Sequence, residues 1–153
     1  MNVTQENFDP KRYLGTWYEV AKKPFPFEKG CEYAVAEYTW ENGMMNIKNS
    51  CLDNNRNIIR ESFGKARIPD MNDKGKLKVK FSGAEAWPGE GDYYVHYTDY
   101  NKYSIVGGPD GRFLWILSRT EKIPKSDLKM LVNKVKSFGY NPDKIMSNKK
   151  FLY

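Results

Sequence analysis

The stretch GTWYEVA, residues 15–21, constrains the fold more than any other part of this 153-residue chain. Upstream, Asp9 and Pro10 are typical of the start of a short helical turn, because aspartate caps free N–H groups and proline suits the first helical position. Gly15 then frees the backbone, and an extended strand begins with an aromatic pair. Neighbouring side chains of a strand point to opposite faces, so we expect one ring of Trp17 and Tyr18 in a core and the other outside it.

Seven further stretches have the length, composition and bounding turn residues of β-strands. They are residues 34–40, 44–48, 58–67, 76–81, 93–97, 103–107 and 113–118. The run KLKVKF, residues 76–81, alternates most clearly, with lysines on one face and apolar residues on the other. Tight turns are predicted at Asn42-Gly43 and at Pro109-Asp110-Gly111. Together these signals predict an all-β fold, an eight-stranded up-and-down antiparallel β-barrel.

One α-helix is expected at residues 126–138, where apolar residues recur every three or four positions between a capping Ser126 and Gly139. Its apolar stripe is expected to pack on the barrel wall. The chain has the length of a single domain. We divide it into an N-terminal arm and short turn (1–14), the barrel (15–119), the helix, and a C-terminal tail (139–153) whose last residues, 149–153, are expected to fray.

Continuing the alternation from an inward Trp17 predicts which side chains face the barrel interior. Small residues at Ala36, Gly64 and Ala66 oppose large apolar residues of the later strands, which favours an internal cavity. Close backbone packing in a tapered barrel is the alternative. The inward set is apolar and aromatic, with no charge except Glu19. The predicted ligand-binding side chains are Ala36, Tyr38, Met45, Ile47, Ser62, Val79, Phe81, Tyr93, Tyr97, Val106 and Trp115.

The loop after the first strand contains two prolines, which exclude regular structure there. Its two phenylalanines, Phe25 and Phe27, are predicted either to cover the mouth of the cavity or to pack back on the barrel rim.

Groups suited to catalysis are scarce. The single histidine, His96, alternates outward and is expected on the surface. Serine-hydrolase, phosphate-loop and paired-histidine motifs are absent from the sequence. We therefore expect a binding protein without catalytic residues, cofactor or metal. If the protein were an enzyme, Glu19 and Tyr97 would be the candidates for an inward acid or base.

The net charge of +6 favours solubility with peripheral attraction to an anionic membrane. Nucleic-acid binding is disfavoured, because the lysines of residues 76–80 share a face without interleaved aromatic rings. Residues 1–5 lack the apolar core of a secretory signal, so the chain as written is expected in the cytoplasm. It would be secreted, periplasmic or membrane-associated if a signal has been removed. A monomer or weak dimer is expected.

Cys31 and Cys51 flank the hairpin that turns at Asn42-Gly43. Antiparallel pairing about that turn makes a cross-strand disulfide sterically feasible. Two reduced thiols in a cytosolic protein are the alternative.

Three motifs, in order, resemble the signatures of the lipocalin family. Residues 15–21 resemble the first signature, residues 98–100 the second and residues 118–120 the third. The residues carrying these signatures are Gly15, Trp17, Thr98, Asp99, Tyr100 and Arg119. Residues 106–110 and 114–120 are most similar to the branch of bacterial lipocalins and apolipoprotein D. The resemblance implies that Arg119 lies against Trp17 and closes the barrel floor, and it favours the disulfide, because related lipocalins carry a cysteine pair at similar positions.

The same resemblance implies a carrier that holds a small hydrophobic ligand in its barrel, in this branch a long-chain fatty acid or lysophospholipid. An apolar lining would suit an acyl chain, since burial yields about 0.8 kcal/mol per methylene. The alternatives are a lipocalin-fold enzyme acting on a lipid-like substrate and a membrane-associated module acting through its basic surface. A cytosolic fatty-acid-binding protein is rejected, because that family places two short helices directly after its first strand.

Overall fold

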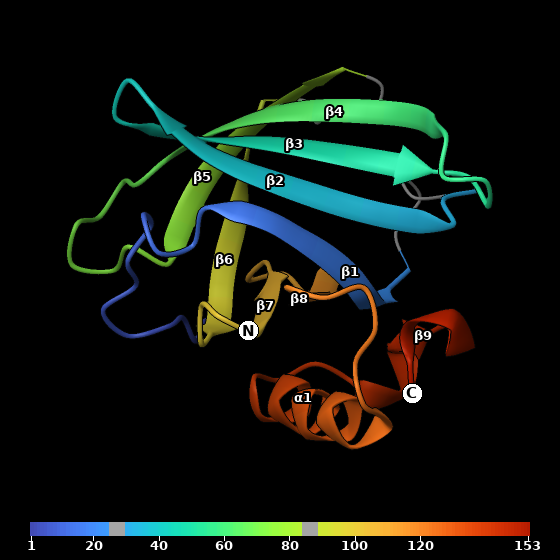
Figure 1. Cartoon of the computed structure of the whole chain (residues 1–153). Helices are drawn as coiled ribbons and strands as arrows, with labels where there is room; N and C mark the ends of the chain where they lie inside the picture. Colours follow the sequence, from blue (N-terminus) through green and yellow to red (C-terminus); the bar gives the residue numbers. More distant parts are fainter. Residues whose placement is uncertain (25–29, 84–88) are drawn as a thin grey trace.

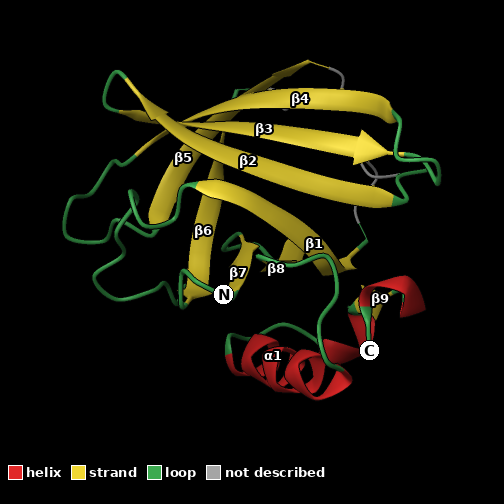
Figure 2. Ribbon diagram, viewed as in Figure 1, coloured by secondary structure: helices red, strands yellow, loops and turns green. Residues whose placement is uncertain are grey.

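The computed structural model describes residues 1–24, 30–83 and 89–153, and its strands form a closed antiparallel barrel (Figures 1 and 2). The barrel strands are β1 (Gly15–Lys23), β2 (Tyr33–Glu41), β3 (Met44–Leu52), β4 (Ile58–Arg67), β5 (Lys76–Gly83), β6 (Glu90–Thr98), β7 (Tyr103–Gly107) and β8 (Leu114–Ser118). Each strand from β2 to β7 pairs with the next one in the chain, and β1 closes the barrel by pairing with both β8 and β2. The predicted eight-stranded up-and-down barrel is confirmed.

The β2–β3 hairpin turns where the sequence predicts it. Asn42 and Gly43 have φ angles of 53° and 75°, and two positive φ angles in succession are what a two-residue hairpin turn requires. Glu41 therefore pairs directly with Met44, and this fixes the register along the whole hairpin.

Two apolar clusters lie on opposite sides of the barrel wall. The inner cluster fills much of the barrel and contains Trp17, which is fully buried, while Tyr18 on the opposite face of β1 stays half-buried. The expected division of this aromatic pair is confirmed. The outer cluster lies between the wall and the C-terminal helix.

The helix α1 (Lys125–Ser137) covers one side of the barrel, as Figure 1 shows. Leu131 and Val135 are fully buried and belong to the outer cluster, so the predicted packing on the wall is confirmed. The helix begins one residue earlier than predicted, with Pro124 at the N-cap position instead of Ser126. Within the described ranges, no helix is both long and apolar enough to cross a bilayer.

The C-terminal tail is folded onto the barrel, so the expected fraying is wrong. It forms η2 (Pro142–Lys144), β9 (Met146–Ser147) and η3 (Lys149–Phe151). Strand β9 pairs with β1, and the Ile123 N–H donates to the Phe151 carbonyl at 2.9 Å. The Phe151 ring also packs edge-on against Tyr33, with 5.8 Å between centroids. These backbone partners and the aromatic contact offset the entropy lost by ordering the tail.

A β-bulge in β6 breaks the predicted alternation. Val95 pairs with Val106 and Tyr97 pairs with Ile105, so His96 is the extra residue. As a result Tyr97 leaves the barrel interior and packs with the outer cluster, where the Lys134 ammonium lies 4.5 Å from its ring centroid. The inward placement of Tyr97 is therefore wrong.

His96 points outward as predicted, but it is only 2% exposed, and the expectation of a surface histidine is wrong. Its Nδ1 lies 2.5 Å from the Val3 carbonyl oxygen and its Nε2 lies 2.7 Å from the Tyr140 hydroxyl. The Phe138 ring stacks on the imidazole at 5.5 Å. The bulge, the helix C-terminus and the N-terminal arm thus meet around one histidine.

Candidate functional site

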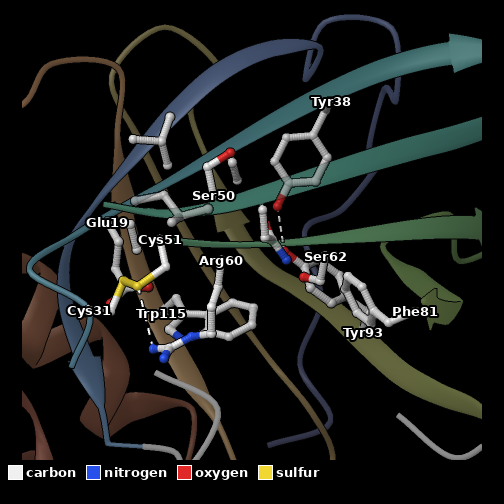
Figure 3. Close-up of a pocket in the computed structure, with 15 residues that line it drawn as sticks. Glu19, Cys31, Tyr38, Ser50, Cys51, Arg60, Ser62, Phe81, Tyr93 and Trp115 are labelled. Atoms are coloured by element: carbon white, nitrogen blue, oxygen red, sulfur yellow. Dashed lines mark hydrogen bonds between the residues drawn. A yellow bond between two sulfur atoms is a disulfide. The ribbon is translucent and has the colours of Figure 1, made fainter. Parts of the chain in front are cut away.

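A cavity of about 70 Å³ lies beside the Cys31–Cys51 disulfide (Figure 3). The disulfide joins the residue two positions before β2 to the third strand, which decides between the two alternatives for the cysteines. Six of the predicted ligand-binding residues line this cavity: Ala36, Tyr38, Ser62, Phe81, Tyr93 and Trp115. Contact of these six with a ligand remains a prediction.

The other predicted residues lie elsewhere. Met45, Ile47, Val79 and Val106 are buried in the inner cluster and do not line the cavity. They pack the barrel interior around it. Tyr97, as described above, lies outside the barrel. Phe25 and Phe27 lie outside the described residues.

The small residues on β4 do not create the predicted space. A Cβ atom at Gly64 would lie 2.8 Å from Cε1 of Phe81 and 3.0 Å from Cγ1 of Val79. Ala66 is buried in the inner cluster and does not line the cavity. At both positions close packing is the correct interpretation, and only Ala36 of the three small residues borders the cavity.

Neutral tyrosine hydroxyls border the cavity on one side. The hydroxyls of Tyr38 and Tyr93 are hydrogen-bonded to each other. Burial raises the pKa of both phenols well above 10, so neither ionises near neutral pH. The Tyr13 hydroxyl meets Ser104 Oγ at 2.6 Å within the same core. This side of the cavity offers uncharged hydroxyls and aromatic edges.

The barrel floor is closed as the family resemblance implies. The Arg119 guanidinium lies 3.7 Å from the Trp17 ring centroid. Its Nε donates to the Tyr100 carbonyl at 2.9 Å and its Nη1 donates to the Thr16 carbonyl at 3.0 Å. The predicted contact of Arg119 with Trp17 is confirmed.

Charged and polar groups missed by the sequence reasoning line the cavity too. They are Arg60 and Asn49, together with Ser50. Arg60 Nη2 lies 3.6 Å from Cys51 Sγ, beside the disulfide (Figure 3). Alternation could have found both larger side chains, because Arg60 is two residues before Ser62 on β4 and Asn49 is two residues after Ile47 on β3. The expectation of an interior without charge apart from Glu19 is therefore corrected.

The cavity wall combines one carboxylate with this guanidinium. The Glu19 side chain is 12% exposed and its Oε1 lies 3.8 Å from Lys22 Nζ. Lys22 pairs across the sheet with Trp115, at the same end of the barrel. A largely apolar chamber with a guanidinium on its wall can hold an amphiphile whose polar head is anionic.

Of the two candidates for an inward acid or base, only Glu19 faces the cavity. Glu19 lines the cavity, whereas the Tyr97 hydroxyl lies outside the barrel and donates to Asp99 Oδ2 at 3.5 Å. Among the described residues, no group of three or more His, Cys, Asp or Glu side chains is arranged to hold a metal ion.

Comparison with known proteins agrees with this architecture. A family model described as a lipocalin-like domain matches residues 8–150. The outer membrane lipoprotein Blc of Escherichia coli strain K12 is 41% identical over 119 residues, which are 76% of this chain and 65% of the lipoprotein. Mouse apolipoprotein D is 31% identical over 150 residues, covering 92% of this chain and 76% of the relative. Insecticyanin from the tobacco hornworm superimposes with a TM-score of 0.72 at 22% identity, over 100% of this chain and 91% of the other, and this likeness concerns the fold alone.

Proposed function

Because this chain belongs to the lipocalin family, whose fold encloses a small hydrophobic ligand, we propose that its barrel carries a single-chain lipid with an anionic head, a long-chain fatty acid or a lysophospholipid. The observation that carries this proposal is the position of Arg60, a cation on the wall of an otherwise largely apolar chamber. The acyl chain would lie among Ala36, Phe81, Tyr93 and Trp115, and the head would lie toward Arg60.

The size of the cavity implies that binding widens it. A volume of about 70 Å³ is well below the roughly 300–1,000 Å³ of typical ligand pockets. The lining is rich in aromatic side chains, and a lipid tail would displace them into new rotamers. Burying each methylene is worth about 0.8 kcal/mol, so a long tail can offset this rearrangement.

The relatives and the disulfide support an exported protein. The Escherichia coli relative is named as an outer membrane lipoprotein, and disulfides persist in oxidising compartments. We accordingly propose the secreted, periplasmic or membrane-associated alternative for its location. The monomer or weak dimer stays a prediction.

Binding of paired ligands to Arg60→Gln tests the role of the guanidinium. A fatty acid should bind the wild type at one site per chain with micromolar or tighter affinity. Loss of a charge-assisted hydrogen bond, worth about 1.5–3 kcal/mol, should weaken the variant's affinity for the acid about 10- to 100-fold. Affinity for the fatty alcohol of equal length should change little. Titration with an apolar fluorescent probe and native mass spectrometry measure both ligands.

Lys65→Gln is the matched control, because Lys65 lies on the same strand, points outward and is exposed. It should leave both affinities unchanged. Equal weakening of acid and alcohol by Arg60→Gln would show that Arg60 shapes the chamber without recognising the head. Absence of binding by either ligand to the wild type would contradict the proposal as a whole.

A further inference from the structure

The positive charge of this protein is concentrated in its C-terminal part. Residues 120–153 contain eight lysines and three acidic residues, so they hold a net +5 of the molecule's +6. The preceding 119 residues are nearly neutral, with 17 basic and 16 acidic side chains. The attraction of the molecule for anions therefore depends chiefly on α1 and the segments next to it.

Three lysines of α1 form one stripe on its solvent side, which we call the lysine stripe: Lys125, Lys129 and Lys136. At 100° per residue, these three positions lie within about 40° of one another around the helix. All three are exposed, while Leu131 and Val135 on the opposite side are buried against the barrel. The stripe therefore faces solvent and not the barrel wall.

Two of the three acidic groups of residues 120–153 are engaged elsewhere. Glu121 forms a two-bonded ion pair with Arg56, at 2.6 and 3.0 Å. Asp127 Oδ2 accepts a hydrogen bond from the Tyr103 hydroxyl at 2.5 Å. In the parts of the chain that the structure describes, the stripe lysines take part in none of the ion pairs. Their charge is thus available to a partner.

We propose that the lysine stripe docks the protein on an anionic phospholipid surface. Lysines on the polar face of a surface helix attract anionic lipids, each contributing about 1 kcal/mol near the membrane. A nucleic-acid surface is a poorer match, because it favours arginine forks and stacking aromatic rings, and the exposed side of α1 presents neither. This docking is independent of the ligand in the barrel.

Partitioning onto vesicles tests the docking surface. The wild type should sediment with mixed phosphatidylcholine–phosphatidylglycerol vesicles at low salt and not with pure phosphatidylcholine vesicles. Binding should weaken as added salt shortens the Debye length from about 30 to 8 Å. The triple variant Lys125→Gln, Lys129→Gln, Lys136→Gln should lose about 10- to 100-fold in partition coefficient.

A second triple variant, Lys11→Gln, Lys65→Gln, Lys80→Gln, removes the same charge from exposed positions elsewhere. It should bind the mixed vesicles within about threefold of the wild type. Equal losses in both triple variants would assign the binding to overall charge and overturn the proposal. So would equal binding to pure phosphatidylcholine, no binding to either vesicle, or tighter binding of the wild type to a DNA duplex at the same salt. Unchanged uptake of the apolar probe by both variants would show that membrane docking does not depend on ligand binding in the cavity.

Discussion

Arg119 holds the barrel floor through two kinds of contact at once. Its plane stacks on Trp17 at 3.7 Å, and its N–H groups reach the carbonyls of Tyr100, Thr16 and Tyr13. The Trp17 Nε1 donates to the same Tyr13 carbonyl at 2.9 Å. Only a planar fork of donors can stack and donate in this way, and a lysine ammonium cannot.

We expect Arg119→Lys and Trp17→Phe each to lower the free energy of unfolding by about 1–3 kcal/mol. Lipid affinity should stay nearly intact, because neither residue lines the cavity. Urea denaturation measures the stability and probe titration the affinity. In the double variant the losses should be less than additive, because the two residues share one contact; strictly additive losses would show that they do not interact.

The contact between the end of α1 and β6 depends on the bulge at His96. The imidazole is enclosed by Phe138, Tyr140 and the Val3 carbonyl. Burial lowers the pKa of His96 to about 4, although the Val3 carbonyl acts in the opposite direction. The folded state therefore binds the proton more weakly than the unfolded chain, whose histidine has a pKa near 6.5.

The resulting pH dependence has a definite sign and window. The contribution of His96 to stability is complete above pH 6.5 and is lost as the pH falls from about 6.5 to 4, by roughly 3 kcal/mol at about 1.4 kcal/mol per pKa unit. Unfolding of the wild type and of His96→Gln should be compared at several pH values. The stability difference between them should shrink or reverse toward pH 4. Parallel curves would mean that His96 titrates alike in the folded and unfolded states.

The C-terminal tail connects several parts of the molecule at one end of the barrel. Its strand β9 pairs with β1, and residues of η3 contact the start of β2. Lys150 bridges Glu32 at 3.0 Å and lies 4.2 Å from the Tyr33 ring centroid, while Phe151 packs on the same ring. The last residues of the chain thus brace the barrel end that carries the disulfide.

We predict that Phe151→Ala lowers the free energy of unfolding by about 1–3 kcal/mol, since a half-buried aromatic ring is removed. Tyr153→Ala, two residues further on, removes a ring that is 71% exposed and should cost little. Thermal unfolding of both variants provides the comparison. Equal and small effects would indicate that the tail adds nothing to barrel stability.

Local patterns predicted most of the architecture. Strand alternation, the Asn42-Gly43 turn and the apolar period of residues 126–138 are properties of neighbouring residues, and all three appear in the structure. The bulge at His96 could not be read in this way, because it depends on how β6 meets β7 and costs little in local propensity. One extra residue there reversed the faces of the last residues of β6 and removed Tyr97 from the interior.

Short-range periodicity and turn residues predicted the closed barrel and the docked helix, and the family resemblance implied the contact between Trp17 and Arg119. The shape of the cavity depends on tertiary packing instead. The Phe81 ring packs directly on Gly64 and fills the space that the absence of a side chain at Gly64 leaves. Arg60 forms part of the cavity wall beside the disulfide. The volume left for a cavity depends on which side chains are neighbours across strands. Those neighbours are set by strand register and by bulges, which no single segment encodes.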